Sequence, residues 1–185
     1  RAIIGIYRKS FGDRNSEDAR FYAPYIGVLP KADLTKKGII CMYDGLILHG
    51  GLTDRERGLL TTYKEVRRRG IPFYIHWNHP FELTDYLQPA TFDWRIDPEE
   101  ISYSAEDSFP VLIQDHRKVI NRLRLTGALY KCRKQTLVYS NSDNGRGCYA
   151  ELYKELFRPT ERLEKAVKIH SGQLGEHYWA FSFRF

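Results

Sequence analysis

The first residues that could bind a ligand or take part in catalysis are two glycines directly before a helix-like segment, Gly50 and Gly51 in "LHGGLTDRERG" (residues 48–58). A helix amino terminus presents unpaired N–H groups and about half a positive charge, and glycine lets a phosphate approach the backbone closely. Arg55 and Arg57 would add charged, fork-shaped donors. The pattern is neither GxGxxG nor GxxxxGKS/T, so it indicates neither a dinucleotide fingerprint nor a P-loop. These residues could still hold an anion at the helix amino terminus. They could also simply reverse the chain before a surface helix, and the residues alone do not distinguish the two possibilities.

Two histidines stand three residues apart in "HWNHP", at the end of an expected strand. Because side chains alternate along a strand, His76 and His79 should point to opposite faces. No third ligand stands at an obvious spacing, so we predict no metal site. The carboxyl ends of strands are where open α/β sheets bind ligands, which makes His79 a candidate pocket residue.

The segment "FELTDYLQPATFDW" (residues 81–94) mixes aromatic side chains with carboxylates. Carboxylates beside aromatic rings suit sugar binding, so Asp85 joins His79 as a candidate acceptor or pocket residue. A loop packed onto the sheet by its aromatic rings would show the same composition.

The final residues, "WAFSFRF", alternate between aromatic and smaller side chains. Arg184 falls on the face that carries Ala180 and Ser182, where an arginine is costly to bury without an anion. An arginine exposed near the end of a strand is the alternative.

The composition excludes several classes of protein. A hydrophobic fraction of 42% and an aromatic fraction of 14% are typical of a folded chain rather than a disordered one. The three cysteines are widely spaced, which suits a reducing compartment and argues against zinc. No run reaches the roughly 20 apolar residues of a membrane span, and no signal-peptide pattern is present. The net charge of +6 favours acidic partners, but the basic residues are scattered, which does not favour nucleic acid.

Strand and helix signals alternate along the chain. The apolar runs on either side of Asp44-Gly45 predict two short strands joined by a tight turn. The segment 53–70 predicts a helix that Thr53 caps, with Glu56 completing a capping box and Gly70 stopping it. Further strands are expected at 72–77, 99–104, 109–114, 135–140 and 178–185, and further helices at 116–132, 149–157 and 159–170.

This order predicts an α/β fold, a Rossmann-like three-layer domain with a mainly parallel sheet, because a strand–helix–strand crossover implies a parallel pair. We expect residues 1–37 to form an amino-terminal extension, 38–177 the α/β domain, and 178–185 the first strand of a truncated second domain. An apolar alternating run at the very end of the chain predicts a fragment of a longer protein.

The segments "HGGLTDRERGLLTTYKEVRRRGIPFYIHWNHPFELTDYLQPATFDW" and "ELFRPTERLEKAV", followed by "YWAFSFRF", resemble bacterial fucosyltransferase-like glycosyltransferases of capsule and surface-polysaccharide synthesis. That group is distantly similar to nodulation fucosyltransferases and protein O-fucosyltransferases. The similarity covers roughly residues 38–185. Two positions depart from it, because Thr53-Asp54 stands where Gly-Asn is common and Ser182 where a histidine is usual.

The resemblance implies the amino-terminal half of a GT-B-type enzyme that binds a nucleotide-sugar donor, GDP-fucose, in the cleft between two Rossmann-like halves. Because most of the donor half would follow Arg184, the fragment is expected to be inactive alone. Transfer to a glycan acceptor would invert the anomeric centre and need neither a metal nor a further cofactor. Arg184 would be the catalytic residue, neutralising the β-phosphate of the leaving GDP. The donor-binding positions that it implies are His49, Gly50, Gly51, Leu52, Asp54 and Arg55.

The resemblance also places the protein in the cytoplasm, with peripheral contact to the inner membrane face left open. The general base is not identified, and Asp54, Glu56 and His79 remain candidates. The rival hypotheses are a non-catalytic, basic α/β module that binds anions or nucleic acid, and a degenerate domain that retains only the fold.

Overall fold

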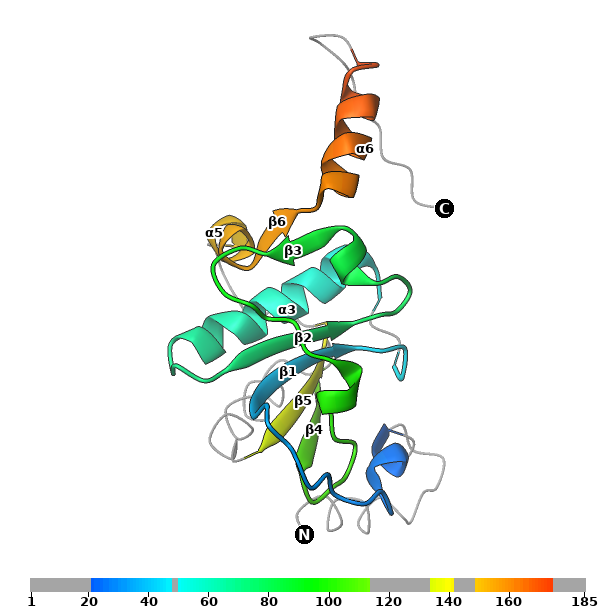
Figure 1. Ribbon diagram of the computed structural model, residues 1–185, viewed down its shortest axis with the longest axis vertical. Helices are drawn as coiled ribbons and strands as arrows, with labels where there is room; N and C mark the ends of the chain where they lie inside the picture. The colour runs from blue at the N-terminus through cyan, green and yellow to red at the C-terminus, as the bar shows by residue number, and fades with distance from the viewer. Residues whose placement is uncertain (1–20, 48–49, 114–133, 142–148, 175–185) are drawn as a thin grey trace.

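The computed structural model describes residues 21–47, 50–113, 134–141 and 149–174 of the 185-residue chain. Its centre is a four-stranded sheet in the order β2-β1-β5-β4, in which every neighbouring pair is parallel (Figure 1). The strands are β1 (Gly38–Tyr43), β2 (Phe73–Trp77), β4 (Ser108–Ile113) and β5 (Gln135–Ser140). The prediction of an α/β fold with a mainly parallel sheet is confirmed, and the architecture is compatible with a Rossmann-like fold.

Both central strands are buried along their whole length, as expected for a parallel sheet covered on both faces. Alternate β1 residues enter two separate apolar clusters, with Ile39, Cys41 and Tyr43 on one face and Ile40 and Met42 on the other. This alternation follows from the two-residue period of a strand.

One face of the sheet is covered by helix α3 (Leu52–Arg67) and the shorter helix α5 (Tyr149–Leu156). Leu59, Tyr63 and Val66 supply the buried stripe of α3, as their helical spacing predicts. β1, α3 and β2 form the expected βαβ unit, because β1 pairs with β2 in parallel.

The other face is covered by irregular chain and short 3-10 helices, namely η1 (Ala23–Tyr25) and η3 (Pro98–Glu100). Phe21, Tyr22 and Tyr25 are buried there against the sheet. These three residues of the expected amino-terminal extension therefore belong to the core, whereas residues 26–37 are mostly exposed.

A small antiparallel ribbon joins β3 (Leu87–Pro89) to β6 (Phe157–Pro159), and the 3-10 helix η2 (Leu83–Asp85) precedes it. Helix α6 (Glu161–Ser171) follows β6 and extends away from the sheet in Figure 1. The side chain of Thr160 caps α6 by accepting a hydrogen bond from the Leu163 N–H.

Three local predictions are wrong. Asp44-Gly45 joins no hairpin, because both neighbours of β1 are parallel strands and residues 46–47 form bends. Gly51, not Thr53, occupies the N-cap of α3. Residues 101–104 form no strand, because the Ser102 N–H donates to the Gln135 side chain instead of to a neighbouring backbone.

The strands expected at 72–77, 109–114 and 135–140 and the helices expected at 149–157 and 159–170 are confirmed within a few residues. The helix expected at 116–132 and the strand expected at 178–185 lie outside the described residues.

Candidate functional site at the carboxyl edge of the sheet

The turn before α3 is closed by a carboxylate of the helix itself. Gly50 has φ +73°, a left-handed conformation that favours glycine, and leads into the N-cap Gly51. The Gly51 N–H donates to Asp54 Oδ2 over 3.2 Å. A Cβ at Gly50 would lie only 2.8 Å from the same oxygen. The turn therefore holds a negative charge against the helix amino terminus, which favours the helix but competes with a bound anion.

Arg55 joins the turn before α3 to the loop after β2. Its Nε donates to the Gly50 carbonyl over 3.3 Å, and its NH1 donates to the His79 carbonyl. The guanidinium carbon lies 5.8 Å from the centre of the Trp77 ring, within reach of a cation–π interaction. These contacts fix a positive charge at the carboxyl ends of β1 and β2, while the guanidinium keeps further N–H groups for a ligand.

The first half of α3 approaches the end of β5 very closely at Gly58. A Cβ at this position would lie 2.3 Å from the Ser140 carbonyl oxygen and 3.0 Å from the Asn141 Cα. The Tyr43 hydroxyl lies beside the same contact, 2.8 Å from the Arg55 carbonyl and 3.1 Å from the Ser140 carbonyl. Glycine at 58 is therefore what allows the helix amino terminus to sit over the carboxyl edge of the sheet.

Directly after β1, the Asp44 carboxylate accepts hydrogen bonds from two tyrosines, and a third tyrosine bonds to one of these two. Asp44 Oδ2 accepts from the Tyr139 hydroxyl over 3.0 Å and from the Tyr103 hydroxyl over 3.3 Å. The hydroxyls of Tyr25 and Tyr139 are 2.7 Å apart. Burial raises the pKa of all three tyrosines well above the usual value for a phenol, so they remain protonated donors. We call Asp44, Tyr25, Tyr103 and Tyr139 the Asp44 cluster.

The two predicted pocket residues, His79 and Asp85, lie in different parts of the structure. The His79 ring packs on Gly45, where a Cβ would meet it at 3.0 Å, so His79 lies beside the Asp44 cluster and Arg55. Asp85 contacts the start of α6 instead, through an ion pair of 3.2 Å to Arg162 and a hydrogen bond from Thr160 to its carbonyl. Asp85 is therefore not part of the group that Arg55 and His79 form.

The predicted site residues fall into two sets. The structure brings together Gly50, Gly51, Asp54, Arg55 and His79, and Leu52 stands half exposed at the first position of α3. His49 and Arg184 lie outside the described residues.

The sequence reasoning missed the Asp44 cluster and Gly58. The tyrosines stand 59 and 95 positions from Asp44, so no local spacing connects them. Gly58 carried a usable signal, because an isolated glycine within a strong helix pattern often marks a close packing contact.

Within the described ranges, no group of three or more His, Cys, Asp and Glu side chains is arranged to hold a metal ion. None of the described helices is both long and apolar enough to pass through a bilayer. Comparison of the chain with models of protein families gives no match, and comparison with curated proteins gives none either.

Proposed function

We propose that this protein is a fucosyltransferase-like glycosyltransferase that takes a sugar from a nucleotide-sugar donor, GDP-fucose, and passes it to a glycan acceptor in surface-polysaccharide synthesis. The α/β unit is then the amino-terminal half of a GT-B-type enzyme. Transfer proceeds with inversion and without a metal, at the cytoplasmic side of the membrane. The proposal starts from the resemblance that the sequence predicts between the segments around Gly50 and Arg184 and that family.

The observation that carries the proposal is the position of Arg55. Its guanidinium is fixed at the carboxyl edge of a parallel sheet, beside a glycine turn and a helix amino terminus, which is where α/β sheets bind phosphorylated ligands. A cation held in advance can meet a diphosphate without reorganisation, which suits a reaction whose leaving group gains negative charge.

The capping role of Asp54 shapes this proposal. Because Asp54 accepts the N–H of the N-cap Gly51, its carboxylate stands at the helix amino terminus, and the donor phosphate meets the Arg55 guanidinium instead of that N–H. Like charges repel, so Asp54 weakens nucleotide binding and helps the release of GDP. Arg184 remains the residue proposed to neutralise the β-phosphate of the leaving GDP.

Calorimetric titration of the full-length protein with GDP-fucose, GDP and UDP-galactose tests the proposal, together with its release of GDP in the presence of glycan acceptors. Arg55→Ala should weaken GDP binding about 10- to 100-fold, the effect of losing a hydrogen bond to a charged group. The matched control is Arg57→Ala, which removes the same charge from an exposed position of the same helix. Asp54→Asn should tighten GDP binding several-fold.

Equal losses in Arg55→Ala and Arg57→Ala would contradict the assigned phosphate contact. Failure of the protein to bind any of the three nucleotides would remove the transferase proposal itself.

A further inference from the structure

A cavity lies on the outer side of the edge strand β2. Its lining includes no residue of the Arg55 turn, although Trp77 contributes to the cavity and its ring lies 5.8 Å from the Arg55 guanidinium. The cavity has a volume of about 200 Å³ and lies between β2, the 3-10 helix η2 and the segment 94–98. Its walls are formed by Ile75, His76, Trp77, Glu82, Leu83, Thr84, Trp94, Arg95, Ile96 and Pro98. We call this space the His76 cavity.

We propose that the His76 cavity binds one neutral, hydroxyl-rich ring, a single sugar residue, through the His76 imidazole and the polar groups at its rim. This binding is independent of the nucleotide site proposed above.

The strongest evidence is the histidine itself. His76 is only 7% exposed, and neither ring nitrogen has a hydrogen-bond partner among the residues that the structure describes. Both ring nitrogens keep some accessible surface, since neither is among the fully buried side-chain atoms that lack a partner. Because His76 lines the cavity, water or a ligand there can supply the hydrogen bonds that the described residues do not.

The charge around the cavity disfavours an anionic ligand. Burial lowers the pKa of His76, although the carboxylates of Asp44 and Glu82 act in the opposite direction, so the imidazole is neutral and can both donate and accept. The Arg95 guanidinium is already held by Asp93 through two hydrogen bonds of 2.8 Å. The ion pair offsets the charge of Arg95, and Glu82 disfavours an anionic ligand.

The remaining walls and the size fit one sugar ring. Trp77, Trp94, Leu83 and Ile96 offer apolar surfaces for the C–H faces of a ring, and the Thr84 hydroxyl adds a polar group at the rim. Ligand pockets with a few polar groups in an apolar lining are typical of small-molecule sites. Pockets for drug-sized ligands start at roughly 300 Å³, so the smaller cavity suits a single ring.

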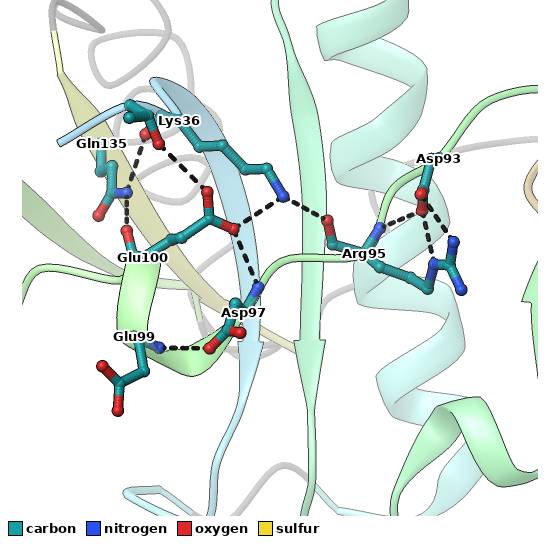
Figure 2. A network of polar contacts seen from close by, with 8 residues as sticks. Lys36, Asp93, Arg95, Asp97, Glu99, Glu100 and Gln135 are labelled. Atoms are coloured by element: carbon teal, nitrogen blue, oxygen red, sulfur yellow. Dashed lines mark hydrogen bonds and ion pairs between the residues drawn. The ribbon is translucent and has the colours of Figure 1, made fainter.

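The wall formed by residues 94–100 is fixed before any ligand binds. Lys36 Nζ lies 2.8 Å from Glu100 Oε2 and donates to the Arg95 carbonyl over 3.2 Å (Figure 2). Figure 2 also shows the Asp97 N–H donating to Glu100 and the Glu99 N–H donating to Asp97, which closes the turn of η3. The Ile75 N–H donates to the Trp94 carbonyl and ties the same wall to β2. A preorganised wall reduces the entropy lost when a ligand binds.

The experiment uses the whole protein and NMR detection of the histidine side chains. The probes are the methyl glycosides of fucose, galactose and N-acetylglucosamine, with glucuronic acid as the anionic and glucosamine as the cationic comparison. At least one neutral methyl glycoside should shift the His76 imidazole resonances with saturation. His76→Phe should weaken that glycoside about tenfold, as expected for one lost hydrogen bond, and His76→Gln should retain most of the affinity.

A second test variant and two controls complete the experiment. Thr84→Val changes an exposed rim residue and should weaken the glycoside even if His76→Phe fails to fold. His170→Gln removes an exposed histidine of α6 and should have no effect. GDP binding, which Arg55→Ala reduces, should stay unchanged in His76→Gln.

Tighter binding of glucuronic acid or glucosamine than of every neutral glycoside would overturn the proposal. Absence of any shift at His76 would overturn it too, since the cavity would then hold only water. Either result leaves the nucleotide titration, and with it the proposed transferase function, to be decided on its own.

Discussion

Gly58→Ala tests how α3 lies on the sheet, and with it the placement of the Arg55 turn. The added Cβ would lie 2.3 Å from the Ser140 carbonyl oxygen and 2.6 Å from the Ser140 carbonyl carbon. Both are backbone atoms of the buried strand β5, so no flexible side chain can give way. Contacts between non-bonded heavy atoms are comfortable at about 3.5 Å, so the helix has to move by about 1 Å.

Two effects of opposite sign decide the size of the change. Alanine is better than glycine inside a helix by about 1 kcal/mol. Overpacking a filled interior costs about 1–3 kcal/mol, and separating α3 from β5 also weakens one of the two hydrogen bonds of the Tyr43 hydroxyl, worth about 1 kcal/mol. The free energy of unfolding should therefore fall by about 1–3 kcal/mol, which lowers the Tm by about 2–12 °C for a chain of this size.

Urea unfolding followed by circular dichroism measures this change. Arg57→Ala, the preceding and exposed position of the same helix, should stay within about 0.5 kcal/mol of the wild type. GDP affinity should fall in Gly58→Ala, because the Arg55 turn moves with the helix. A Gly58→Ala protein that is as stable as the wild type, or more stable, would refute the close approach of α3 to β5.

Three further changes test other contacts of the same region. Asp44→Ala removes the carboxylate to which the half-buried Tyr103 and the buried Tyr139 donate, and should lower the free energy of unfolding by about 1–3 kcal/mol. Asp44→Asn keeps an acceptor and should lose less; equal losses would contradict the hydrogen bonds. His76 has a lowered pKa in the folded state, so the unfolded state binds more protons and stability should fall as the pH drops below about 6.5; this loss should be smaller in His76→Gln, and parallel pH curves would show that His76 does not carry it. Asp93→Asn breaks the ion pair to Arg95, but both side chains are more than half exposed, so the change in unfolding free energy should stay below about 1 kcal/mol; a larger loss would mean that the pair supports the cavity wall.

The elements of the βαβ unit could be predicted because their signals are local. The apolar spacing of Leu59, Tyr63 and Val66 identifies the buried face of α3, and Gly70 marks where it stops. The run "PFYIHW" identifies β2 through its aromatic and β-branched residues. Each of these signals involves residues close together in the sequence, so the element can be predicted without any tertiary contact.

The segment 99–104 shows why other elements could not be predicted. Its alternation in "EEISYS" has the period of a strand, but the Gln135 side chain takes the Ser102 N–H and the Glu100 carbonyl. A side chain 33 positions away therefore satisfies the backbone groups that a strand would have offered to a neighbour. A local sequence pattern cannot predict that a distant side chain will replace a neighbouring strand as the hydrogen-bond partner.

The candidate site also has features that the sequence could predict and features that it could not. The sequence could place Gly50 and Gly51 before a helix, but it could not show that Asp54 would close the turn or that Arg55 would reach His79. Both outcomes depend on the angle at which α3 meets the sheet, which Gly58 permits by its close approach to β5.

The sequence by itself determined the alternation of strands and helices, the parallel βαβ unit and the presence of a glycine turn at a helix start, because capping, propensity and periodicity operate over a few residues. Only the tertiary structure decided that Asp44 would accept hydrogen bonds from Tyr103 and Tyr139, and that His76 would line a cavity with no hydrogen bond to another described residue. These features join segments far apart in the chain, and their geometry exists only once the sheet has brought the strand ends together.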